Sequence, residues 1–162
     1  MFVYTSKLLK MLKITLSHAN IADLPAMQSL FVETVTHVCS KDYTPDQIKV
    51  WTASIENTQR WADVIGQQYV QIAWIDGKMA GFGSLDNGNY IDFMYVHKDY
   101  QGQGVANAIY TVLEQEAIRQ GSKSITSDVS FTAKPFFEKK RFAALQKQTF
   151  VKSLHHYQSK AG

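Results

Sequence analysis

The segment YVHKDYQGQGVANAIYTVLEQEAIRQG, residues 95–121, decides how the rest of the chain is interpreted. An apolar strand pattern ends near Val96, and an amphipathic helix pattern begins after Gly104. Glycines at positions 102 and 104 allow a sharp turn between the two. The first amides of the helix, from Gln103 to Asn107, have no partner within the helix and lie at the positive end of its dipole. The segment therefore predicts an anion site suited to a phosphate or pyrophosphate.

Other interpretations of the glycine turn have less support. A dinucleotide-binding turn needs a glycine where Asn107 stands, and it follows alternating strand and helix units that this chain lacks. An ATP-type P-loop needs a lysine after Gly104, and none is there. A plain connector between a strand and a helix stays open, because lone glycine motifs are common.

Upstream of this segment, the sequence predicts a strand, three helices and an antiparallel meander of three strands. The sequence TPDQ, at 44–47, is a capping box with proline at the first helical position. Asp76-Gly77 and the turn at 86–89 favour hairpins between the strands of the meander. The first strand is expected at 13–18, and the three strands of the meander at 69–76, 78–85 and 90–97. The first helix should run from Asn20 or Asp23 to about Cys39, and the second should begin at Thr44. The third is expected around 59–65, with Gly66 as its C-cap.

Downstream, the helix after Gly104 is expected to end at Gly121, and a strand at 124–130 should lie parallel to the strand before that helix. A short helix in TAKPFFEKK and one or two strands between Phe142 and about Tyr157 follow. The fold class is α+β, with a mixed, mostly antiparallel central sheet flanked by helices. We interpret residues 11–162 as a single domain and residues 1–10 as a flexible extension, which an upstream start codon would explain.

Composition narrows the class of protein. The chain has 162 residues, of which 45% are hydrophobic and 19% charged, and no apolar run approaches the length of a membrane helix. The net charge of +3 has no concentrated basic face, so neither nucleic acid nor a membrane is expected as a partner. Cys39 is the only cysteine, which excludes an internal disulfide and fits a cytoplasmic location. His155 and His156 would point to opposite faces of a strand, and no metal is expected. A homodimer is left open.

Gln101, Gly104 and Ala106 spell the pattern Q-x-x-G-x-A between a strand and a helix. This stretch resembles the coenzyme A loop of the GNAT superfamily of N-acetyltransferases. The order of elements is also similar, so the resemblance covers nearly all of the chain from about Lys13. The segments DYTPDQIKVW (42–51) and DVSFTAKPFFEKKRF (128–142) are similar to one branch of uncharacterised acetyltransferases that includes YafP.

The resemblance implies that the chain binds acetyl-CoA as a cosubstrate. The pyrophosphate would lie on the amides of the loop, and the pantetheine arm would pair with the strand before it. A bulge would splay that strand from the strand at 124–130, and the thioester would enter the gap. The implied cofactor-binding residues are Met94, Tyr95, Val96, Gln101, Gly102, Gln103, Gly104, Val105, Ala106, Asn107, Phe131 and Phe137.

Asp92 and Tyr157 are the predicted catalytic residues. An amine near its usual pKa is mostly protonated at neutral pH, so transfer needs a base or a water relay, and Asp92 is the first candidate. The alternative for Asp92 is a carboxylate that is hydrogen-bonded at a strand end or to the adjacent hairpin. Many members of the family use a tyrosine as the acid where this chain has Phe137. The thiolate therefore leaves unassisted, or another hydroxyl such as Tyr157 or Ser130 protonates it.

His97 and the pair of Glu33 and His37 each have a functional and a structural interpretation. His97 could act as a base, but a solvated loop histidine is the commoner case. Glu33 and His37 could line an acceptor cleft, although a solvated surface pair is favoured. Arg141 replaces the glycine that the family usually has there, which puts the local turn in question.

The aromatic residues Tyr43, Trp51 and Trp61 either form a wall for the acceptor or pack the helices, and packing is favoured. The leading functional hypothesis is an N-acetyltransferase that transfers the acetyl group of acetyl-CoA to a primary amine by direct attack. Its acceptor is a small molecule or a protein. The alternative is a non-catalytic domain that binds or senses acyl-CoA, because Phe137 has no proton to donate.

Overall fold

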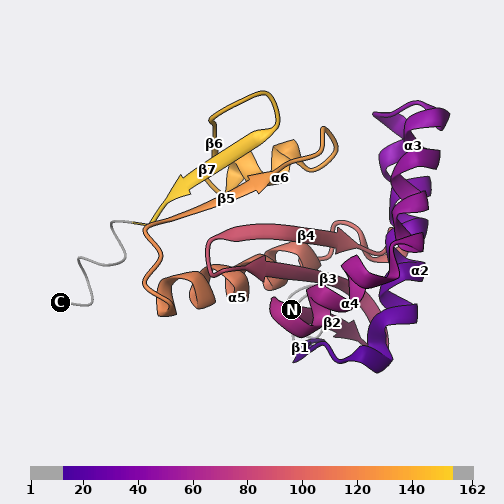
Figure 1. Ribbon diagram of the computed structural model, residues 1–162, viewed down its shortest axis with the longest axis horizontal. Helices are drawn as coiled ribbons and strands as arrows, with labels where there is room; N and C mark the ends of the chain where they lie inside the picture. Colours follow the sequence, from indigo (N-terminus) through magenta and orange to yellow (C-terminus); the bar gives the residue numbers. More distant parts are fainter. Residues whose placement is uncertain (1–12, 155–162) are drawn as a thin grey trace, which may run out of the picture.

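The computed structural model describes residues 13–154, which form a seven-stranded sheet in the order β1-β2-β3-β4-β5-β7-β6 (Figure 1). Only β4 and β5 are parallel neighbours. The predicted α+β class with a mixed, mostly antiparallel sheet is confirmed. The strands are β1 (Ile14–His18), β2 (Tyr69–Ile75), β3 (Lys78–Asp86), β4 (Tyr90–Val96), β5 (Ser124–Asp128), β6 (Ala143–Ala144) and β7 (Thr149–Ser153).

Helices cover both faces of this sheet, and none of those between residues 13 and 154 is long and apolar enough to cross a membrane. The α-helices are α2 (Leu24–His37), α3 (Pro45–Thr52), α4 (Thr58–Gln67), α5 (Val105–Arg119) and α6 (Lys134–Lys139). Short 3-10 helices are η1 (Ile21–Asp23), η2 (Cys39–Lys41), η3 (Ala53–Glu56) and η4 (Lys98–Tyr100). The predicted extension at 1–10 lies outside the described residues.

Local signals account for some helix ends and not for others. The predicted capping box starts α3, where the Thr44 hydroxyl accepts from the Gln47 amide at 3.2 Å and the Gln47 side chain accepts from the Thr44 amide at 2.9 Å. The predicted C-cap at Gly66 is wrong, because Gly66 lies inside α4 and does not adopt a positive φ. Buried Trp61 anchors α4 to the sheet, so the helix continues past the glycine to Gln67.

Two apolar cores lie on opposite faces of the sheet, one under α5 and one under α2 and α4. Helix α5 packs directly on the backbone of β3 at two glycines. A Cβ at Gly83 would lie 2.5 Å from Cγ2 of Ile109, and a Cβ at Gly81 would lie 2.8 Å from the Tyr95 carbonyl oxygen. This close approach brings the start of α5, with the glycine turn before it, against β4.

The sheet opens between β4 and β5. These strands pair only through Tyr90 with Thr126 and Ile91 with Ser127, although β4 continues to Val96. The register between β3 and β4 shifts at this point, because Asp92 is an extra residue in β4 and forms a β-bulge. In Figure 1, β5, β7 and α6 lie apart from the second half of β4. The predicted splay is therefore confirmed.

Arg141 adopts the conformation that glycine would favour. It follows α6 with a φ of 69°, in the left-handed region that costs an L-residue about 1 kcal/mol. We expect Arg141→Gly to raise the free energy of unfolding by about 0.5–1 kcal/mol, measured by urea denaturation. Lys139→Gly, inside α6, is the matched control and should lower it by a similar amount. A loss of stability in both variants would contradict the inference that the backbone of Arg141 is strained.

Candidate active site

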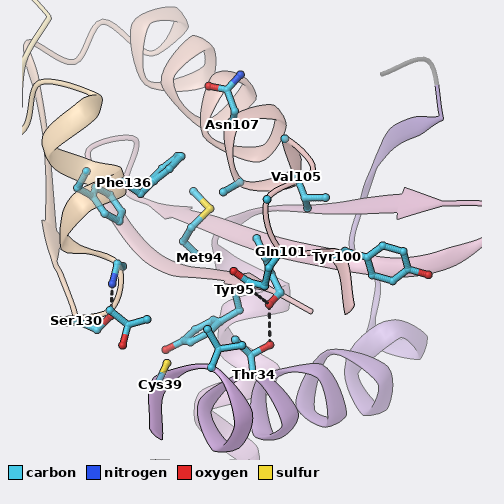
Figure 2. A pocket seen from close by; sticks show the side chains of 18 residues that line it. Thr34, Cys39, Met94, Tyr95, Tyr100, Gln101, Val105, Asn107, Ser130 and Phe136 are labelled. Atoms are coloured by element: carbon cyan, nitrogen blue, oxygen red, sulfur yellow. Dashed lines mark hydrogen bonds between the residues drawn. The ribbon is translucent and has the colours of Figure 1, made fainter. Parts of the chain in front are cut away.

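A cavity of about 330 Å³ opens where β4 and β5 separate (Figure 2). All of the predicted cofactor-binding residues line it except Gln103 and Phe131. Gln103 donates from its side chain to the Asp99 carbonyl at 3.3 Å, and Phe131 lies outside the cavity with 57% of its surface exposed. The lining comprises Thr34, Val38, Cys39, Met94, Tyr95, Val96, Tyr100, Gln101, Gly102, Gly104, Val105, Ala106, Asn107, Ser130, Thr132, Ala133, Phe136 and Phe137.

The glycine turn presents the start of α5 to this cavity. Gly102 and Gly104 have φ values of 70° and 86°, and a Cβ on either would have no atom within 4 Å. Gly104 is the N-cap of α5 and supplies no side chain to the first helical amides. The side-chain amine of Lys140 contacts the side-chain oxygen of Asn107, which adds a positive charge beside these amides. Open amides, the helix dipole and a lysine together suit an anion.

The second half of β4 offers backbone groups to the same cavity. The carbonyls of Phe93 and Tyr95 lie close to Gly83 and Gly81 of β3. Because successive carbonyls of a strand point in opposite directions, the backbone groups of Met94 and Val96 point away from β3 and toward the open side. An extended ligand could pair there as an additional strand would.

Two side chains hold the end of β4 in place. The Val96 carbonyl accepts from the Thr34 hydroxyl at 2.9 Å and from the Gln101 side chain at 2.7 Å (Figure 2). Sequence reasoning missed Thr34, although one signal was present. Thr34 is a polar residue on the apolar side of α2, where its neighbour Val35 and the preceding Phe31 are buried. Such a residue usually has a hydrogen-bond partner.

The remaining walls of the cavity carry little acid–base chemistry. Phe137 is buried at 2% exposure and lines the cavity without a hydroxyl. Burial raises the pKa of Cys39, which keeps its thiol protonated. The Ser130 hydroxyl lines the cavity and accepts from the Ala133 amide at 3.1 Å. Tyr157, the predicted acid, lies outside the described residues.

Asp92 lies on the other side of Tyr95, in a separate pocket of about 320 Å³ whose lining also includes Tyr95. Its carboxylate accepts from Arg60 at 2.8 Å and from the Gln68 side chain at 2.7 Å, and the side chain is only 10% exposed. The hydrogen bond to Asp92 raises the pKa of Arg60. A hydrogen-bonded carboxylate was the alternative to a base for Asp92, and these contacts do not test the chemistry, so a role as base stays a prediction.

His97 has fixed partners. Its Nε2 lies 2.9 Å from a carboxylate oxygen of Glu33, and its Nδ1 accepts from the Asp99 amide at 3.1 Å. The ring is 19% exposed, so the expected solvated loop histidine is wrong. Glu33 contacts His97 instead of forming the expected surface pair with His37. Between residues 13 and 154, no group of three His, Cys, Asp or Glu residues is placed to hold a metal ion.

Comparison with known proteins points to one family. The model of the acetyltransferase (GNAT) domain family matches residues 39–159. YafP, an uncharacterised N-acetyltransferase of Escherichia coli K12, is 32% identical over 126 residues, which cover 78% of this chain and 79% of YafP.

Solved structures have the same fold. A GCN5-related N-acetyltransferase from Rhodopseudomonas palustris has a TM-score of 0.84 and 28% identity, covering 86% of this chain and 95% of that one. The PaiA N-acetyltransferase of Thermoplasma acidophilum, solved with coenzyme A, has a TM-score of 0.74 and 15% identity over 85% of this chain and 96% of that one. The family match, the identity to YafP and the splayed sheet together show that the chain belongs to the GNAT family of N-acetyltransferases.

Proposed function

We propose that the protein transfers the acetyl group of acetyl-CoA to a primary amine by direct attack. The observation that carries the proposal is that an anion site and an open strand edge line one cavity. The pyrophosphate of acetyl-CoA would bind the amides between Gln103 and Asn107, with Lys140 beside them. The pantetheine arm would pair with the backbone of Met94 and Val96. Binding of coenzyme A by the distant structural relative PaiA supports this assignment.

In the reaction, the amine nitrogen forms a bond to the acetyl carbonyl carbon, and the bond from that carbon to sulfur breaks. The Val96 amide would polarise the carbonyl, and the alternation of backbone groups along β4, which directs it to the open side, supports this role. The amine loses a proton, for which Asp92 or a water beside it is the proposed acceptor. The thiolate takes a proton from Ser130, from Tyr157 or from water. The acceptor is a small molecule or a protein amine, and we place the reaction in the cytoplasm.

Asp92→Asn tests the base. We expect the rate of acetyl transfer to fall by about a hundredfold, mainly at lower pH where the amine is protonated, while coenzyme A affinity stays the same. The measurement is the pH dependence of kcat/KM. Asp63→Asn is the control, because Asp63 lies on α4 and does not line the pocket of Asp92, and its carboxylate accepts from the Gln59 side chain at 2.7 Å. Identical pH profiles for Asp92→Asn and the unmodified protein would remove Asp92 from the mechanism.

The direct test of the function uses acetyl-CoA and a panel of primary amines, with detection of free thiol. We expect release of thiol that depends on the amine, and a product that mass spectrometry identifies as the N-acetyl amine. The alternative of a non-catalytic acyl-CoA-binding domain is motivated by Phe137 at the usual position of the acid. Coenzyme A binding without amine-dependent thiol release would favour that alternative.

A further inference from the structure

A third pocket, of about 280 Å³, adjoins the cofactor cavity. The two share Tyr95 and Ser130 in their linings, so they meet at the gap between β4 and β5. Figure 2 shows the ring of Tyr95 pointing toward the end of the cavity where Ser130 lies. Tyr43, Trp51 and Asp128 form further walls of this third pocket, which we name the aromatic pocket. A ligand in it would lie next to a thioester in the gap.

Three aromatic rings enclose the aromatic pocket at steep angles to one another. The ring centroids of Tyr43 and Trp51 are 5.2 Å apart at 65°, and those of Trp51 and Tyr95 are 6.4 Å apart at 63°. At these distances and angles the rings contact one another edge to face, and all three also line the pocket. Aromatic faces arranged around a small space attract an organic cation through their negative quadrupoles.

The wall at Tyr43 is held from outside the pocket. The Tyr43 hydroxyl accepts from the Phe131 amide at 2.9 Å, and the two rings are 5.5 Å apart at 30°. Next to this contact, the Thr132 hydroxyl donates to the carboxylate of Asp42 at 2.7 Å. The loop before α3 is thereby joined to the loop before α6. The pocket is formed before any ligand binds, which lowers the entropy lost on binding.

Asp128 adds a fixed negative charge to the aromatic pocket. One carboxylate oxygen accepts from the Tyr90 hydroxyl at 2.9 Å and the other from the Thr149 hydroxyl at 2.7 Å. Burial, followed by the hydrogen bond to Asp128, raises the pKa of Tyr90 to about 12, so this hydroxyl stays a donor. Within the described range 13–154, no lysine, arginine or histidine forms an ion pair with Asp128. The carboxylate is thus oriented by two hydroxyls, and no cation in the described part of the chain pairs with it.

We propose that the aromatic pocket binds a second, non-reacting cationic nitrogen of the acceptor. The attacking amine must be neutral, whereas aromatic faces and a carboxylate favour the charged form of an amine. The pocket therefore suits a nitrogen that stays charged while another nitrogen, near Tyr95 and Ser130, reacts. The acceptor class is that of α,ω-diamines and other primary amines with a separate cationic group. This inference rests on the proposed acetyl transfer for the identity of the reacting site.

The first test compares diamines of three to five carbons with the monoamines of matching length. We expect kcat/KM for the best diamine to exceed that of its monoamine by at least about tenfold. Trp51→Leu and Asp128→Asn should each bring this ratio close to one. Trp74→Leu and Asp63→Asn are the controls, because Trp74 donates to Ser17 on β1 and neither control residue lines the aromatic pocket. Equal kcat/KM for diamine and monoamine, or a ratio that survives both pocket variants, would overturn the proposal.

The second test needs no turnover. Tetramethylammonium chloride is titrated into the protein saturated with coenzyme A, and binding is followed by calorimetry. We expect binding that Trp51→Leu and Asp128→Asn weaken by about tenfold and that the control variants leave unchanged. Absence of binding to the unmodified protein would overturn the pocket assignment even if amines are acetylated. Failure of the protein to bind coenzyme A would instead contradict the proposed function, and the same cation titration without coenzyme A would decide the pocket.

Discussion

Gly104→Glu is expected to lower the affinity for coenzyme A by at least about a hundredfold, because a carboxylate beside the first amides of α5 would repel the pyrophosphate. The side chain would also enter the open space that a Cβ at Gly104 now has around it. The measurement is calorimetric titration with coenzyme A, together with circular dichroism to show that the variant is folded. Because the loss is in binding, the KM for acetyl-CoA should rise while kcat changes much less, so high concentrations of acetyl-CoA should restore activity.

The control for this prediction is Gly121→Glu. Gly121 has a φ of 81° against 86° for Gly104, and a Cβ at either would have no atom within 4 Å. The two variants therefore carry the same new charge and similar backbone strain, but Gly121 lies at the other end of α5. We expect Gly121→Glu to lose some stability and to bind coenzyme A normally. Equal loss of affinity in both variants would attribute the effect to strain and not to the loop.

Glu114→Leu is expected to lower the free energy of unfolding by about 3–5 kcal/mol, because it leaves a buried lysine without its partner. Lys152 of β7 has 9% of its side chain exposed and donates to Glu114 at 3.1 Å and to the Tyr110 hydroxyl at 3.0 Å. Its side chain also lies over the ring of Tyr110. The measurement is urea denaturation at neutral pH.

Replacing both partners should recover this stability. We expect Glu114→Leu combined with Lys152→Met to unfold within about 1 kcal/mol of the unmodified protein, because the double variant leaves no uncompensated charge in the core. Lys13→Met, which breaks the exposed ion pair with Asp76 at 3.8 Å, is the control and should change stability by less than about 1 kcal/mol. A double variant as unstable as Glu114→Leu alone would show that packing, and not the unpaired charge, is responsible.

The sequence by itself determined the elements and the glycine loop. The capping box at Thr44 and Gln47 and the positive φ of Gly102 and Gly104 are set by residues close together in the chain. Hairpin turns and amphipathic periods are local in the same way, so the order of strands and helices could be predicted. Where a local rule failed, at Gly66, packing of the buried helix face outweighed the preference of one glycine.

Only the tertiary structure decided which side chains meet. Thr34 reaches Val96 across 62 positions of sequence, and Gln68 reaches Asp92 across 24. From the sequence, Lys152 could be counted only toward the net charge. In the structure it is buried on β7 and contacts Glu114 of α5. Such contacts depend on the register of the sheet and on how closely helices approach it. Spacing along the chain carries no information on either, so the surroundings of Asp92 and the aromatic pocket follow from packing alone.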